Sequence, residues 1–497
     1  MNRTRCRRAV PLHRHRSEYA LLDTASIPTQ KPAAHTHAVT AAAPAAPAPP
    51  APTRAPNEPR PSTGSVRLPS STGAIRTLGS NPATAPIMLH PGDSIPKRRR
   101  TLYIILLGAL TALGPFTIDL YLPAFPVLEA EFNTTAAAIQ LTLTGTMIGF
   151  GLGQLIVGPL SDKVGRRVPL LSVTALHVLA SLGAAMAPTL ELLSAARVVQ
   201  GAGAAAGGVV AAAIVRDLFG GRRLVVMLSR LALVSGVAPV LAPLVGSTLL
   251  LVMPWRGVFV VLAVYGAVML VCATIFLPET LPPARRHGGK GSTTVWQRYR
   301  GVLSDRVFIG VLIIGGMTFS GLFSYLSSSS FLFQLDYGFD AQQYGMLFAV
   351  NSLGVVLGVQ TASRLAARFG PQWVLAWSTA VLVVAASAII VTDQLGFGIW
   401  GTIVPLFFFM TACGFTFPCV QVLALDRHGK AAGTAQSIIG FTNFGVAGLI
   451  SPLVGWIARD AGITPTTMAS VMAACAVVAV LSLWFVVRPR TVERLAP

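Results

Sequence analysis

Charged residues are scarce in this chain, and acidic residues are the scarcest. Only 11% of the 497 residues are charged, and 18 Asp and Glu stand beside 38 Lys and Arg. A typical soluble domain has about 25% charged residues. Hydrophobic residues make up 53% of this chain. The composition excludes an ordinary soluble protein and predicts an integral membrane protein.

Cysteine and histidine are also rare, and they do not cluster. The cysteines show neither a disulfide framework nor a metal-ligand spacing: Cys6, Cys272, Cys413, Cys419 and Cys475. No pair of apolar segments offers clustered His or Cys or paired carboxylates, and no P-loop is present. We therefore expect no metal, no cofactor, no enzyme active site and no nucleotide-driven transport.

Residues 1–96 lack sustained hydrophobic periodicity. They are rich in Ala, Pro, Thr and Arg and cannot bury enough apolar surface to offset the entropy of ordering. The apolar run of about 7 to 15 residues that a secretory signal needs is missing. We predict a disordered cytoplasmic tail, with a mis-called start and translation from Met88 as the alternative.

Long apolar segments fill the rest of the chain, each about the 20 residues that cross a bilayer as a helix. Twelve spans are predicted at 102–123, 137–160, 168–187, 193–214, 225–250, 256–277, 307–332, 342–363, 372–392, 398–424, 432–457 and 464–487. The predicted fold is all-α, with two pseudo-symmetric six-helix bundles. The domains are an N-terminal bundle (97–277), a cytoplasmic linker (278–306), a C-terminal bundle (307–490) and a cytoplasmic tail (491–497).

The net charge of +20 is distributed unevenly over the connections. If the connections alternate between the two sides of the membrane, nearly all Lys and Arg after residue 96 fall on one side, and Arg256 and Arg459 fall on the other. By the positive-inside rule both termini are predicted to be cytoplasmic. This distribution also argues against nucleic acid as a partner.

Three sequence features recur between the two halves. Leu241–Gly246 in the fifth span is repeated as Ile450–Gly455 in the eleventh, and Gly165 after the second span matches Gly370 after the eighth. Arg216-Asp217 and Asp426-Arg427 follow the fourth and tenth spans. Parallel six-helix halves place a substrate site between them.

A charged turn joins the second and third spans. It reads Gly-Pro-Leu-Ser-Asp-Lys-Val-Gly-Arg-Arg over residues 158–167. Its glycines allow close approach of two helix ends, and its charges can pair with another helix end. We predict a conformational switch that locks the first half to the second, made of Gly158, Asp162, Gly165, Arg166, Arg167 and Asp217.

At these residues the chain resembles the major facilitator superfamily, and within it the drug:proton antiporters of the Bcr/CflA (bicyclomycin and chloramphenicol resistance) group. Residues 158–167 are similar to the family's loop signature, 193–203 to its fourth-helix signature, and 119–123 to the subgroup's marker. Residues 236–246 resemble the antiporter signature of the fifth helix, with Gly236, Pro239, Pro243 and Gly246. The resemblance implies a transporter that exports its substrate.

Two positions depart from the family pattern. Ser247 stands where a second glycine is common, which leaves close helix packing possible. Ala367 stands where the second half would repeat Asp162, which makes the charged switch asymmetric.

Charges inside the predicted spans are few, and such charges are functional candidates because they are costly in a membrane. Asp119 is the one carboxylate that we place within a span, and Arg197 is the corresponding base. Both lie toward the outer ends of their helices, so we expect them to meet at similar depth. A movement of one residue relative to the other would make Asp119 bind and release a proton. The alternatives are an interfacial cap for Asp119 and a structural tie to backbone carbonyls for Arg197.

Polar residues in or beside the spans are candidates for a substrate cavity. The cavity candidates are Tyr121, Gln200, Asn351, Gln436 and Asn443. Other polar groups of the second half are Ser327–Ser330, Gln334, Gln360 and Gln421. The sequence leaves open which of them line the cavity.

The predicted function is multidrug or antibiotic efflux of small, mainly apolar, drug-like compounds across the bacterial inner membrane in exchange for protons. The proton gradient is the expected energy source, membrane lipid is a partner, and the protein is expected to be a monomer. The alternatives are a proton-coupled uptake permease for a small metabolite and a non-transporting membrane sensor.

Overall fold

The computed structural model describes residues 92, 95–283, 286, 295–428, 432–459 and 462–491. All of them belong to one compact unit. Nearly all of the predicted N-terminal tail and C-terminal tail, and part of the predicted linker, lie outside these residues.

The described residues form helices and no strands, and twelve helical segments are long and apolar enough to cross a membrane. This confirms the predicted all-α fold. The first half contains α1 (Lys97–Asp119), η3 (Leu122–Ala124), α2 (Phe125–Glu131), α3 (Ala136–Val164), α4 (Arg167–Ala185), α5 (Leu190–Leu218), α6 (Gly221–Leu249) and α7 (Trp255–Phe276).

The second half begins after α8 (Val295–Leu303), a short helix within the predicted linker. It contains α9 (Arg306–Phe331), η5 (Leu332–Asp336), α10 (Ala341–Phe369), α11 (Pro371–Gln394), α12 (Gly398–Asp426), α13 (Ala432–Ile450), α14 (Leu453–Ile457), α15 (Pro465–Leu481), η7 (Ser482–Val487) and η8 (Pro489–Thr491). The eleventh span is broken between α13 and α14, where Pro452 lacks the N–H that a continuous helix needs.

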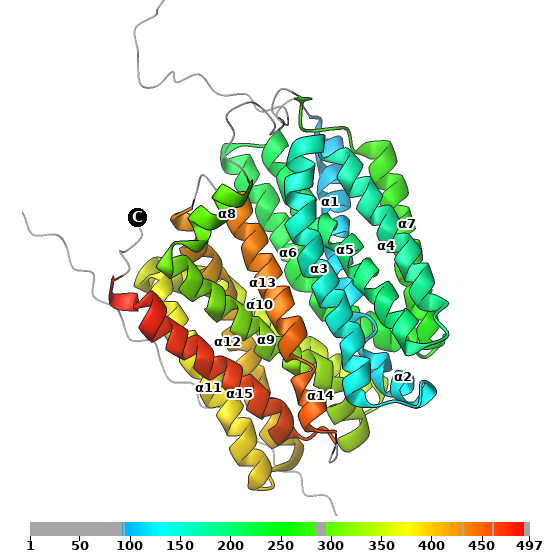
Figure 1. Ribbon diagram of the computed structural model, residues 1–497, viewed down its shortest axis with the longest axis vertical. Helices are drawn as coiled ribbons and strands as arrows, with labels where there is room; N and C mark the ends of the chain where they lie inside the picture. The colour runs from blue at the N-terminus through cyan, green and yellow to red at the C-terminus, as the bar shows by residue number, and fades with distance from the viewer. Residues whose placement is uncertain are drawn as a thin grey trace, which may run out of the picture. The chain divides into compact units, whose positions relative to one another are not determined.

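The helix bundle has two ends, the linker face and the far face. The linker face is the end where α1 begins, where α3 meets α4 and where α8 lies (Figure 1). The far face is the opposite end, where α1 stops and α2 follows.

Side-chain caps fix where several spans begin. Thr135 and Thr189 accept backbone N–H bonds at the starts of α3 and α5, and Asp305 does so at the start of α9. Asp340 and Thr464 form reciprocal capping boxes on α10 and α15. These residues satisfy N–H groups that the first turn of a helix leaves without partners.

The repeated glycines make equivalent turns at the linker face. Gly165 (φ 111°) separates α3 from α4, and Gly370 (φ 88°) separates α10 from α11. Both backbone angles lie in the region that favours glycine. The match found in the sequence is therefore a repeat of local structure.

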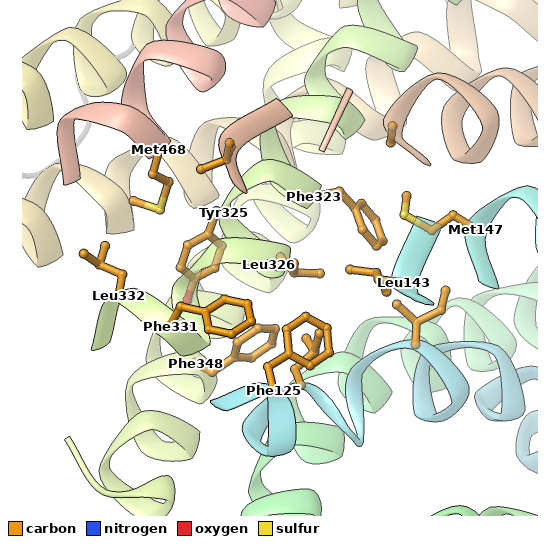
Figure 2. Packing of buried hydrophobic residues seen from close by; sticks show 14 of the residues in the cluster. Phe125, Leu143, Met147, Phe323, Tyr325, Leu326, Phe331, Leu332, Phe348 and Met468 are labelled. Carbon is orange, nitrogen blue, oxygen red and sulfur yellow. The ribbon is translucent and has the colours of Figure 1, made fainter. Parts of the chain in front are cut away.

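The two halves pack through α3 against α13 and through α6 against α10. Figure 1 shows α3 and α13 side by side. At the far face the two halves are joined by apolar packing. Phe125 and Phe331 have ring centroids 5.6 Å apart, and Figure 2 shows them in a cluster that also contains Leu143 and Leu326.

Hydrogen bonds reinforce this far-face closure. The Gln140 side chain donates to the carbonyl of Ser327 (3.2 Å) and accepts from the N–H of Gly455 (3.2 Å). Gln334 donates to the carbonyl of Pro123 (3.1 Å). All three bonds run between the halves, so the far face is closed in this structure.

Candidate functional site

A cavity of about 560 Å³ lies between the two halves. It is bounded by α1, α3 and α6 from the first half and by α9, α10, α12 and α13 from the second. Six phenylalanines line it: Phe150, Phe319, Phe323, Phe348, Phe417 and Phe444. Its volume and apolar wall fit a small organic molecule.

Among the described residues that line this cavity, Asp119 is the one with a charge. It is the last residue of α1 and is 4% exposed. Its Oδ1 atom is buried and has no hydrogen-bond partner among the described residues. A buried carboxylate oxygen without a partner is costly, so this group is poised to bind a proton or a polar ligand atom.

Arg197 lies on α5 and is fully buried. Its guanidinium donates to the carbonyl of Thr117 (2.9 Å) and to Oε1 of Gln200 (2.5 Å), and it lies 4.0 Å from the centroid of the Tyr121 ring. No ion pair with Asp119 is present in the described part of the chain. Arg197 therefore binds α1 two residues before Asp119 without pairing with that carboxylate.

The five predicted cavity residues are not part of the cavity lining. The Tyr121 hydroxyl hydrogen-bonds to Thr142, and the Gln200 amide donates to Ser181, so both side chains are bonded inside the first half. Asn351 donates to the hydroxyl of Tyr325 inside the second half.

Gln436 and Asn443 are half-buried on α13. In contrast, the lining does include four polar residues of α6, α10 and α12 that were not among the five: Ser235, Ser352, Gln360 and Gln421. The rotation of each helix about its axis decides which polar side chains face the cavity. The residue type alone does not reveal that rotation.

The residues of the predicted antiporter helix divide into two pairs along α6. Gly236 and Pro239 line the cavity, and Gly236 has open space around it. Nearer the far face, a Cβ on Gly246 would overlap the carbonyl of Leu120, and the carbonyl of Pro243 lies beside Gly345 of α10. The first pair borders the cavity, whereas the second allows helices to approach closely.

The predicted switch residues do come together at the linker face. Arg166 donates to Asp162 (2.5 Å), to Ser161 (2.8 Å) and to Asp217 (2.8 Å). Burial lowers the pKa of Arg166, but the two carboxylates outweigh that effect and raise it overall. The guanidinium thus joins the ends of α3 and α5.

The remaining switch residues make different contacts. Arg167 donates to the carbonyl of Thr274 on α7 (2.7 Å), and a Cβ on Gly158 would lie 3.3 Å from Ser437 of α13. The ion pairs of Arg166 with Asp162 and Asp217 stay within the first half, so these charges do not themselves join the halves here. Gly158 thus lies beside α13 of the second half.

Glu279 completes this cluster and was not predicted from the sequence. Its carboxylate accepts from the backbone N–H groups of Arg166 (2.9 Å) and Arg167 (3.2 Å) at the start of α4. Burial raises the pKa of Glu279, but these N–H donors and those of Thr280 and Leu281 outweigh burial and lower it. The available signal was its position as an acid directly after α7 in a strongly basic connection.

Comparisons with known proteins agree with this architecture. Residues 105–452 and 330–496 match the sequence profile of the Major Facilitator Superfamily. The chain is 36% identical over 364 residues to the "Uncharacterized MFS-type transporter YdgK" of Bacillus subtilis (strain 168), covering 72% of this chain and 89% of that protein.

Two further relatives are named for resistance. The "Bicyclomycin resistance protein homolog" of Haemophilus influenzae is 28% identical over 384 residues (77% of this chain, 96% of that protein). The "Multidrug resistance protein MdtL" of Escherichia fergusonii is 29% identical over 394 residues (78% and 97%). These names agree with the resemblance drawn from the sequence motifs.

Solved structures share the fold at low sequence identity. The xylose transporter XylE from E. coli, in a partially occluded inward open conformation, has a TM-score of 0.63 at 12% identity and covers 80% of this chain and 99% of its own. A bacterial homolog of the lysosomal transporter Spinster has a TM-score of 0.61 at 15% identity, with 81% and 100% covered. The chain belongs to the Major Facilitator Superfamily and is a multi-pass transporter of the bacterial inner membrane.

Proposed function

We propose that this transporter exports small, mainly apolar, drug-like compounds in exchange for protons by alternating access. The observation that carries the proposal is the carboxyl group of Asp119, whose Oδ1 has no hydrogen-bond partner among the described residues and which shares the cavity with phenylalanine side chains. A transporter that exchanges its substrate for protons needs, at the substrate-binding site, a group that can be either protonated or ionised. The resistance names of two relatives support export of drug-like compounds.

Alternating access requires one face to close while the other opens. In this structure the far face is closed by Phe125, Phe331 and the Gln140 bonds. We assign this arrangement to a state in which the cavity is reached from the linker face.

The linker face is proposed to be cytoplasmic, with both termini on that side. The support is the concentration of Lys and Arg at that end of the spans. A C-terminal alkaline phosphatase fusion is expected to be inactive and a fluorescent protein fusion bright; the opposite pair of results would overturn this orientation.

Asp119→Asn tests the proton site directly. The amide keeps the size of the side chain but cannot ionise, so substrate binding is expected to survive while uphill export fails. The measurement is drug accumulation in inside-out vesicles driven by a pH difference alone, with the exposed far-face Asp336→Asn as the matched control. Accumulation by the Asp119→Asn protein at the wild-type level would contradict the proposal, and proton-driven movement in the opposite direction would identify an uptake permease.

Arg197 is proposed to hold the end of α1, and with it Asp119, in place. Lysine cannot reproduce its forked donation to Thr117 and Gln200, so Arg197→Lys is expected to impair coupling nearly as much as Arg197→Ala. The readout is the number of protons taken up per substrate exported. Normal coupling in the Arg197→Lys variant would show that position 197 needs only a positive charge.

The linker-face cluster is proposed to govern switching between states. Asp162→Asn is expected to slow export of all substrates alike while leaving equilibrium binding intact, because Asp162 lies outside the cavity and bonds to Arg166. A changed substrate range would instead indicate a direct binding role.

A further inference from the structure

A second hollow lies on the outside of the C-terminal half, away from the cavity between the halves. It has a volume of about 350 Å³ and is formed by α10, α11 and α12. Its walls are apolar and aromatic, with Phe369, Trp373, Trp377, Phe408 and Phe415 among the lining residues. We call this hollow the lateral groove.

None of the described residues covers the lateral groove, and the two hydroxyl groups in its almost entirely apolar wall are already hydrogen-bonded. Trp377 is 67% exposed and Phe408 is 55% exposed. The hydroxyl of Ser378 donates to Leu375 and accepts from Thr416, and the Thr411 hydroxyl donates to Phe407. The part of a ligand that enters the lateral groove is therefore a hydrocarbon.

Two arginines stand at the linker-face end of the lateral groove. The guanidinium of Arg368 lies 5.3 Å from the ring centroid of Phe369, which lines the groove, and Arg364 is one turn away on the same helix. Both side chains are exposed, and neither has an ion-pair partner among the described residues. Asp393, the one acid of α11, lies at the far-face end and bonds to Thr466.

We propose that the lateral groove binds an anionic phospholipid, with one acyl chain between Trp377 and Phe408 and the phosphate on Arg368 and Arg364. Arginine stems extend along apolar surfaces and carry the charge to the headgroup level, and basic residues there favour anionic lipids. An apolar groove beside two exposed arginines fits the two parts of such a lipid. The site is separate from the cavity that contains Asp119 and does not depend on the transported substrate.

Native mass spectrometry of the purified full-length protein tests the proposal. The probes are phosphatidylglycerol and phosphatidylcholine with identical acyl chains. The wild type is expected to retain one phosphatidylglycerol, bound about tenfold more tightly than phosphatidylcholine. The double variant Arg364→Ala/Arg368→Ala is expected to lose this preference, because the two cations supply it.

Two further variants distinguish lipid binding in the lateral groove from nonspecific attraction of anionic lipid to positive charge. Val381→Trp fills the groove without changing charge and is expected to abolish retention of either lipid. Arg230→Ala, which removes an exposed arginine of α6, is expected to retain phosphatidylglycerol normally. Thermal unfolding identifies any variant that is misfolded. Equal binding of the two lipids to the wild type, undiminished phosphatidylglycerol binding by the double variant, or occupation of the groove by a second copy of the chain would overturn the proposal.

Discussion

Gly165 and Glu279 come so close that a side chain at position 165 would collide with the Glu279 carboxylate. The two residues are far apart in the sequence and meet where α3 ends and α4 begins. Glu279 reaches the backbone N–H groups of α4 across Gly165. The glycine thus provides both a turn with φ 111° and the space for a capping carboxylate.

Gly165→Ala is expected to destabilise the protein by about 1 to 3 kcal/mol, since alanine rarely adopts this backbone conformation. Thermal unfolding in detergent measures the effect. Gly433→Ala is the control, because Gly433 has open space around it. An unfolding temperature equal to that of the wild type would show that the turn rearranges without cost.

The Glu279 carboxylate predicts a pH dependence of stability. Its pKa is lowered in the folded protein, so its stabilising contribution is present above the unfolded pKa of about 4.3 and is lost as the pH falls through the folded value. Glu279→Gln is therefore expected to lower the unfolding temperature at pH 7, with a smaller difference from the wild type in acid. A difference that stays constant down to pH 3 would contradict this assignment.

The helices and their turns could be predicted from the sequence because apolar segments, caps and glycines are local signals. The arrangement of Asp162, Arg166 and Asp217 was also predictable, since all three lie at helix ends on one face. Glu279 was missed because its partners lie in another connection, and only packing of α7 against α4 brings them together. Tyr121 and Asn351 were assigned to the cavity because polarity alone does not separate a residue facing open space from one bonded inside a half.

Two glycines of α6 provide a matched pair for testing helix packing. A Cβ on Gly246 would overlap the carbonyl of Leu120, whereas Gly236 has open space beside it. Gly246→Ala is expected to cost about 1 to 3 kcal/mol through overpacking. Gly236→Ala is expected to be neutral or stabilising, since alanine favours a helix more than glycine. Equal unfolding temperatures for the two variants would contradict the close packing of α6 on the end of α1.

The amide side chains of the cavity are expected to determine which compounds are exported. Gln360 and Gln421 lie on α10 and α12 and are the two amides in a lining that is otherwise mostly apolar. Gln421→Leu keeps the approximate size but removes hydrogen bonding, so substrates with several polar groups are expected to bind about tenfold more weakly, while apolar ones bind equally well or better.

The comparison is a panel of binding constants for the purified wild type, Gln421→Leu and Asn351→Leu. The Asn351 change removes an amide that bonds to Tyr325 outside the cavity, so it is expected to lower stability without altering the order of substrates. A reordered substrate panel in Asn351→Leu, together with an unchanged one in Gln421→Leu, would place the binding site away from this cavity.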